Sequence, residues 1–226
     1  MAYHIDTGLI KEKFKVDCEC PLCEIRAVAE EQFLHEFLND AVMEDGMRGK
    51  VNKLGFCAKH FDMLIARQNK LSVALQISTR LDTLLDKIID NANNVKAAQK
   101  QAEKLADAQK TCIICNLAEE SMEKYYRTIA EMYKRESLFR ESFKASKGFC
   151  LDHYIELLRY AKYAGNMADE FVTDLTQLER KNLYRLKAEL KIFCDKHDYR
   201  NALLPLGNAE TALPRTRIKM YGKRFK

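Results

Sequence analysis

The segment Cys20-Pro21-Leu22-Cys23 constrains this chain most, because the same spacing occurs again at Cys112-Ile113-Ile114-Cys115. Each pair is followed by a second motif that ends in histidine, Gly55-Phe56-Cys57-Ala58-Lys59-His60 and Gly148-Phe149-Cys150-Leu151-Asp152-His153. The Cys-x2-Cys pairs are offset by 92 residues and the Cys-x2-His pairs by 93. This agreement predicts an internal repeat.

The four motifs carry the donor atoms that zinc prefers, thiolate sulfur and imidazole nitrogen. Four such donors form a tetrahedron around one ion, so a Cys-x2-Cys pair needs one Cys-x2-His pair to complete a site. Pairing neighbours in sequence closes the shorter loop, which costs less chain entropy. We therefore expect two zinc ions per chain, in sites made of Cys20, Cys23, Cys57 and His60, and of Cys112, Cys115, Cys150 and His153.

Two other interpretations of the cysteines stay open. Free cysteine is often an ordinary core residue, and an iron–sulfur cluster could take the same donors with Cys18 as a further thiolate. Residues 1–17 contain no apolar core of a signal peptide, which favours a reducing cytoplasmic setting over disulfides. Cys194 and His197 repeat the half-site spacing, but no third Cys-x2-Cys pair is present to meet them.

The scarcity of proline predicts an all-α protein. The three prolines are Pro21, Pro205 and Pro214, so nothing between the first two breaks a helix except glycines and polar turns. We expect two homologous three-helix lobes: a leader at 1–17, the first lobe at 18–91, a solvated helical connector at 92–110, the second lobe at 111–201 and a basic C-terminal tail at 202–226. Residues 46–54 are expected to form a loop.

Helical periodicity predicts where the core residues lie. The first helix should begin at Pro21, a favoured first position. A long helix from about Leu71 should turn one apolar stripe inward, made of Leu75, Leu81, Leu84, Leu85, Ile88 and Ile89.

Positive charge is concentrated at the C-terminus. The chain carries a net charge of +5, and residues 215–226 hold six basic residues and no acidic one. This tail is a candidate nucleic-acid contact, in which cations would lie against phosphates and an aromatic ring would stack on a base. A solvated tail and a tail that docks on the protein's own surface are the alternatives. The candidate residues are Arg215, Arg217, Lys219, Tyr221, Lys223 and Arg224. No apolar run approaches the ~18 residues of a membrane span.

The motifs resemble an uncharacterised bacterial family, mostly from Firmicutes, that is classed as a domain of unknown function and whose members are sometimes labelled ABC-transporter substrate-binding proteins. The resemblance rests on Glu19-Cys20-Pro21-Leu22-Cys23, Ser146-Lys147-Gly148-Phe149-Cys150, Asp198-Tyr199-Arg200-Asn201 and Pro205-Leu206-Gly207-Asn208. It covers nearly the whole chain and implies no established activity. The transporter label gains no support, because the sequence lacks an α/β pattern.

Three functional hypotheses follow from the residues. The first is a zinc-stabilised, non-catalytic helical scaffold that binds a macromolecular partner such as RNA, DNA or another protein. It is favoured because Cys3His leaves no open metal position for water, so an enzyme is not expected. The second is an iron–sulfur or thiol protein with a redox or sensing role. The third is a protein–protein adaptor that uses a groove between the lobes.

Overall fold

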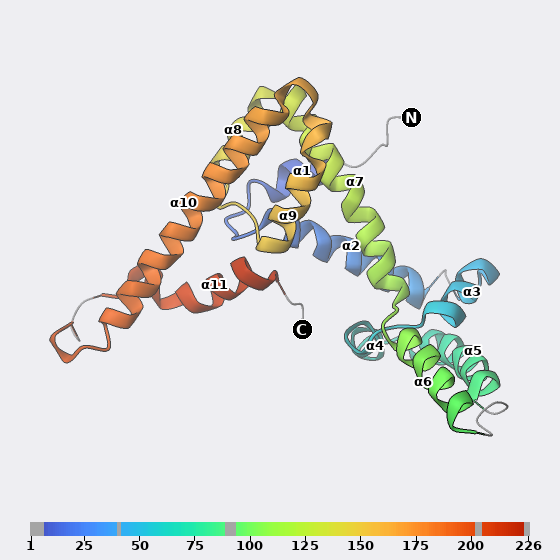
Figure 1. Ribbon diagram of the computed structural model, residues 1–226. Coiled ribbons are helices and arrows are strands. Elements are labelled where there is room, and N and C mark those ends of the chain that lie inside the picture. The colour runs from blue at the N-terminus through green and yellow to red at the C-terminus, as the bar shows by residue number, and fades with distance from the viewer. Residues whose placement is uncertain (1–6, 40–41, 89–93, 202–204, 224–226) are drawn as a thin grey trace. The chain divides into compact units, whose positions relative to one another are not determined.

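The computed structural model describes residues 7–39, 42–88, 94–201 and 205–223, without the side chains of residues 87 and 199 (Figure 1). Within these ranges the chain is all-helical and contains no strand, which confirms the predicted class. The helices are α1 (Thr7–Lys13), α2 (Pro21–Leu38), α3 (Asp45–Leu54), α4 (Ala58–Ile65), α5 (Lys70–Ile88), α6 (Val95–Gln109), α7 (Ile113–Arg135), α8 (Ser137–Ala145), α9 (Leu151–Tyr160), α10 (Ala168–Asp195) and α11 (Ala212–Tyr221), with short 3-10 segments η1 (Ala161–Met167), η2 (Tyr199–Asn201) and η3 (Gly207–Thr211).

Each cysteine motif lies at the beginning of a helix. Pro21 is the first residue of α2, as expected, and its fixed φ suits that position. Cys57 and Cys150 are the N-cap residues of α4 and α9, both with extended backbone angles. Because the two potential ligands of each motif are three residues apart, the first helical turn places them on one side.

The chain divides into two compact units, which differ from the predicted lobes. The first unit consists of residues 1–27 and 122–225, and the second of residues 28–121. Both boundaries fall inside helices, since α2 begins in the first unit and α7 begins in the second. The internal repeat itself stays a prediction.

Aromatic side chains form the core of the first unit. Phe143 is fully buried, and its ring lies 5.4 to 6.1 Å, centroid to centroid, from Phe14, Tyr133, Phe149 and Phe171. Phe149 directly precedes Cys150, so the same aromatic core that stabilises the unit also fixes the backbone of one cysteine motif.

A smaller aliphatic core stabilises the second unit. Its buried members come from α2, α3, α4, α5 and α7: Leu34, Phe37, Leu38, Val51, Leu64, Val73, Ile113 and Ile114 together with Cys112. The Phe37 ring packs on the edge of Phe56, with centroids 5.5 Å apart, which places the Cys57 motif against the C-terminal half of α2.

Two local predictions are wrong. Residues 46–54 form most of α3 rather than a loop: Gly46 and Gly49 each cost about 1 kcal/mol in a helix, but the helix buries Val51. The apolar stripe of α5 faces outward, with Leu75, Leu81, Leu85 and Ile88 exposed by 44 to 52 %.

Polar side chains explain the orientation of α5. Its inward face carries Gln76 and Arg80, which donate hydrogen bonds to the backbone carbonyls of Phe37, Asn52 and Lys53. Ile89, the last residue of the expected stripe, lies outside the described residues.

The predicted solvated helix at 92–110 corresponds to α6, which buries none of its described side chains. No helix within the described ranges combines the length and the apolar character that crossing a membrane requires.

We predict that Phe143→Ala lowers the free energy of unfolding of the first unit by about 3–5 kcal/mol, because it leaves a cavity among four aromatic rings. Leu138→Ala on the same helix is the matched control: its side chain is 75 % exposed, so the expected change is within about 0.5 kcal/mol. Urea unfolding followed by circular dichroism measures both. If both substitutions changed the free energy of unfolding equally little, Phe143 would not be a core residue.

Candidate metal centres

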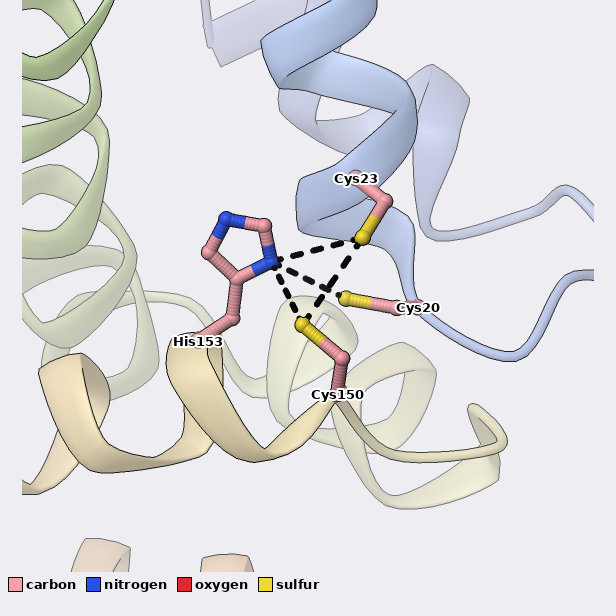
Figure 2. Close-up of side chains that lie close together, drawn as sticks. All are labelled: Cys20, Cys23, Cys150 and His153. Carbon is pink, nitrogen blue, oxygen red and sulfur yellow. Dashed lines mark hydrogen bonds between the residues drawn. The ribbon is translucent and has the colours of Figure 1, made fainter. Parts of the chain in front are cut away.

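The first candidate centre joins the beginning of α2 to the beginning of α9 (Figure 2). Cys20 and Cys23 come from the first motif of the chain, and Cys150 and His153 come from the last. All four side chains are at least 95 % buried. Figure 2 shows the Nδ1 atom of His153 facing the three sulfurs.

The donor atoms of the first centre are spaced as a tetrahedral ion requires. His153 Nδ1 lies 3.3 Å from Cys20 Sγ, 3.6 Å from Cys23 Sγ and 3.1 Å from Cys150 Sγ, and the Cys23 and Cys150 sulfurs are 3.8 Å apart. With Zn–S bonds of about 2.3 Å and Zn–N bonds of about 2.0 Å, tetrahedral geometry separates two sulfurs by about 3.8 Å and sulfur from nitrogen by about 3.5 Å. The sulfurs are also too far apart for the ~2.05 Å bond of a disulfide.

The second candidate centre repeats this arrangement with the two remaining motifs. His60 Nδ1 lies 3.3 Å from each of the three sulfurs, and the Cys57 and Cys115 sulfurs are 3.8 Å apart. His60 and Cys112 are buried, whereas Cys57 and Cys115 are half-buried. The second centre is therefore the more accessible to solvent.

The structure brings all eight predicted ligand residues into two groups of four, but the predicted pairing is wrong. Cys20 and Cys23 meet Cys150 and His153, and Cys57 and His60 meet Cys112 and Cys115. The packing of the Cys57 motif explains the exchange: Phe56 packs on Phe37, in the C-terminal half of α2, and both belong to the second unit, whereas Cys20 belongs to the first.

Charge in the first centre favours a bound cation. Hydrogen bonds from Cys20 and Cys23 lower the pKa of Cys150, so this sulfur carries negative charge most readily of the three. Burial raises the pKa of Cys20, and the interaction with Cys150 raises that of Cys23 to about 12. The three sulfurs thus oppose one another's ionisation, and a divalent ion would relieve this by replacing their protons.

In the second centre, too, the pKa of one thiol is lowered and that of a neighbouring thiol is raised. The hydrogen bond from Cys115 lowers the pKa of Cys112 to about 3, and the negative Cys112 in turn raises the pKa of Cys115. Burial works against a charged His60, but its interactions with Cys112 and Glu30 outweigh burial and raise its pKa to about 9.

Glu30 supports the second centre from behind the histidine. Its Oε2 lies 3.8 Å from His60 Nε2, on the ring side opposite the sulfurs, and 2.6 Å from Lys59 Nζ. Burial would raise the pKa of Glu30, yet His60 and Lys59 together lower it to about 2. At 3.8 Å the carboxylate forms no hydrogen bond with His60 Nε2, but its charge attracts the ring N–H and increases the basicity of the Nδ1 atom that faces the sulfurs. Among the described residues, His153 of the first centre forms no ion pair with a carboxylate, and the Tyr126 ring lies 6.0 Å from its ring, centroid to centroid.

Glu30 was missed by the sequence analysis, although a signal was present. It is seven residues before Phe37 and four before Leu34, so it lies on the buried side of α2. A charged residue within an apolar helical face needs a partner.

The basic tail contains α11, and three of its candidate cations contact the first unit. Arg215 pairs with Glu19 and Glu189, Lys219 with Glu179, and Lys223 with Glu24. The Tyr221 side chain is 61 % exposed and Arg217 is half-buried, while Arg224 lies outside the described residues. Nucleic-acid binding by the tail stays a prediction.

Cys18 and Cys194 belong to neither cluster. Cys18 is half-buried, and burial raises the pKa of its thiol to about 11. Cys194 is exposed and, with His197, joins no group of metal-binding side chains among the described residues.

Double cysteine variants test the pairing of the motifs. We predict that Cys20→Ser/Cys150→Ser removes one metal ion and leaves one, because both residues belong to the first centre. Cys20→Ser/Cys57→Ser should remove both ions, because it damages both centres. Native mass spectrometry counts the ions. If Cys20→Ser/Cys150→Ser lost both ions and Cys20→Ser/Cys57→Ser kept one, each centre would be formed by motifs that are neighbours in sequence.

Replacing Glu30 tests its support of His60. We predict that Glu30→Gln weakens metal binding at the second centre by about 10–100-fold and leaves the first unchanged. Glu31→Gln is the control, since Glu31 pairs with Arg67 at the exposed surface. Competition with a chromophoric chelator gives both affinities, and unchanged affinity in Glu30→Gln would assign Glu30 to packing alone.

Comparison with known proteins assigns the chain to a family whose function is unknown. The chain is 25 % identical over 191 residues to an uncharacterised 23.9 kDa protein in the xynA 3′ region of Caldicellulosiruptor sp. (strain Rt8B.4), which covers 84 % of this chain and 87 % of that protein. No solved structure matches. The family model of DUF6062, a family of unknown function, matches residues 1–226, and the chain therefore belongs to this family.

Proposed function

We propose that the protein is a non-catalytic helical scaffold that binds two zinc ions and presents its surface to a macromolecular partner. The two groups of three sulfurs and one imidazole nitrogen carry this proposal, since every donor is within 4.8 Å of the others in its group. Four protein donors fill a tetrahedral ion and leave no position for a water or a substrate. Such a site supports folding rather than catalysis.

The donor spacing favours zinc over an iron–sulfur cluster. Each imidazole nitrogen lies 3.1 to 3.6 Å from its three sulfurs, and all donors of a group lie within 4.8 Å of one another, which fits a single ion. Cys18, the additional thiolate that a cluster could recruit, is absent from the first group. A mixed sulfur and nitrogen tetrahedron is typical of structural zinc sites.

The position of the centres along the chain explains what the ions would do. The first centre connects cysteines separated by 127 residues, and the second connects sulfurs separated by 58. Without metal, closing such long loops costs chain entropy that the small core of the second unit offsets poorly. Metal binding would therefore contribute directly to folding.

A protein partner is better supported than a nucleic acid. Three cations of the tail are engaged in pairs within the first unit, so they are not available to phosphates. By contrast, α5 exposes Leu71, Leu75, Leu81 and Leu85 by 44 to 69 %. An exposed apolar row of this kind is a common feature of protein-binding surfaces. Binding that persists at high salt would agree with an apolar contact.

Removal of the metal tests the scaffold. We predict that chelation under mildly denaturing conditions abolishes the cooperative thermal unfolding of the second unit, because structural zinc contributes about 10–16 kcal/mol in small peptides, which is comparable to the entire stability of a domain. Adding Zn²⁺ should restore the transition, whereas Mg²⁺, which prefers oxygen ligands, should not. Calorimetry with and without metal decides: identical transitions would refute a structural role.

A further inference from the structure

The two motifs of each centre are linked by different hydrogen bonds. In the second centre the motifs contact each other directly: Thr111 Oγ1 donates to the carbonyl of Leu54 at 2.7 Å, and the Ile113 amide donates to the carbonyl of Gly55 at 3.0 Å. These two hydrogen bonds hold the Cys-x2-Cys segment against the segment that leads to Cys57.

The first centre lacks the residues for either bond. At the position of Thr111, directly before the first cysteine, stands Glu19, whose carboxylate has no hydrogen to donate when ionised and accepts instead from Arg185 and Arg215. At the position of Ile113, directly after that cysteine, stands Pro21, which has no amide hydrogen. The carbonyl of Lys147, which corresponds to that of Leu54, therefore needs another donor.

Lys219 of α11 supplies this donor from outside both motifs. Its Nζ donates to the carbonyl of Glu19 at 3.1 Å and to the carbonyl of Lys147 at 2.6 Å. The Lys219 side chain is 0 % exposed. A fully buried ammonium group is costly unless it is paired and hydrogen-bonded, so its position indicates a specific structural role. One side chain thus bridges the segment before Cys20 and the segment before Cys150.

Glu179 of α10 completes the charge balance around this lysine. Its Oε1 lies 3.6 Å from Lys219 Nζ, and its Oε2 accepts from the Phe149 amide at 2.9 Å. Gly148 allows the approach: its φ is +75°, and a Cβ there would lie 2.7 Å from Glu179 Oε2 and 3.2 Å from Lys219 Nζ. In the second unit, Arg80 occupies the equivalent place beside Gly55 and belongs to α5.

The end of α11 reaches the metal-binding sulfurs themselves. The Lys223 amide lies 3.3 Å from Cys23 Sγ and donates to it. Gly222 is buried with a φ of +71°, and a Cβ there would lie 3.7 Å from both Cys23 Sγ and Cys150 Sγ. An amide hydrogen bond to sulfur stabilises the thiolate that a metal ion requires.

Polar contacts, and little apolar burial, hold α11 on the first unit. Only Ala212 and Lys219 of this helix are buried. Ion pairs add to the packing of α11 on α9 and α10: Arg215 pairs with Glu19 and Glu189, and Lys223, just after the helix, pairs with Glu24. A segment with so few buried apolar contacts can open locally while the rest of the unit stays folded.

We propose that α11 is a zinc-dependent closing helix, with Lys219 as the residue that couples its docking to the first centre. A metal ion holds the Cys20 and Cys150 segments together and so positions the two carbonyl groups that bind Lys219. Loss of that ion separates the carbonyl groups and releases a basic helix, while the ion of the second centre has no such effect. Coupling of this kind is reciprocal, so a docked α11 also slows metal loss.

Proteolysis compares the two centres within one protein. In zinc-loaded full-length protein, Cys150→Ser should increase tryptic cleavage after Arg217 at least tenfold, whereas Cys57→Ser should leave it unchanged. The amides of α8, measured in parallel, should stay protected from hydrogen exchange in Cys150→Ser. Unchanged cleavage in Cys150→Ser, or loss of protection in α8 together with α11, would overturn the proposal.

A substitution in α11 tests the reverse direction. Lys219→Met keeps the length of the side chain but cannot bridge the two carbonyl groups, so one of the two zinc ions should transfer to a chelator at least tenfold faster and the other at the parent rate. Arg217→Met on the same helix is the matched control and should change neither rate. Equal rates in Lys219→Met and the parent would contradict the coupling.

This inference rests on the proposed zinc scaffold, and the two can fail separately. A parent protein that binds no zinc would refute the scaffold and the closing helix together. A parent protein that binds two zinc ions, with α11 equally protected in Cys150→Ser and Cys57→Ser, would refute the closing helix alone.

Discussion

The convergence of three sulfurs and one imidazole nitrogen on a single point is the constraint on which the rest of the structure depends. Three thiolates this close repel one another unless a cation lies between them, and the opposed pKa shifts of Cys20, Cys23 and Cys150 agree with this. Each donor pair lies in the first turn of a helix, so a bound ion would fix the start and direction of two helices at once. The short helices α4 and α9, with 8 and 10 residues, gain most from this.

The two centres share a donor set but differ in how the surrounding residues support them. The second contains its own hydrogen bonds through Thr111 and Ile113 and a carboxylate behind His60. The first is more deeply buried, yet it depends on Lys219 from the C-terminal helix. The more deeply buried centre is thus the one that receives support from the C-terminal helix, and the more exposed centre is the one whose two motifs bind each other directly.

The scarcity of proline was sufficient to predict the all-helical class, Pro21 itself marked the start of a helix, and the motif spacing identified the eight residues of the two clusters. The pairing could not be predicted, because it depends on how far α2 carries the chain before the Cys57 motif packs against it. Apolar periodicity placed the leucines of α5 inward, whereas Gln76 and Arg80 occupy that side instead and donate to backbone carbonyl groups of α2 and α3. Likewise, charge alone suggested a solvated or nucleic-acid-binding tail and gave no sign of the carbonyl groups that Lys219 fills.

Elemental analysis by native mass spectrometry, on protein purified without added metal, tests the central claim most directly. The account predicts two zinc ions per chain, with the six cysteines of the two centres protected from alkylation until the metal is removed. Iron with inorganic sulfide, or a metal-free chain in which all eight cysteines react at once, would contradict it.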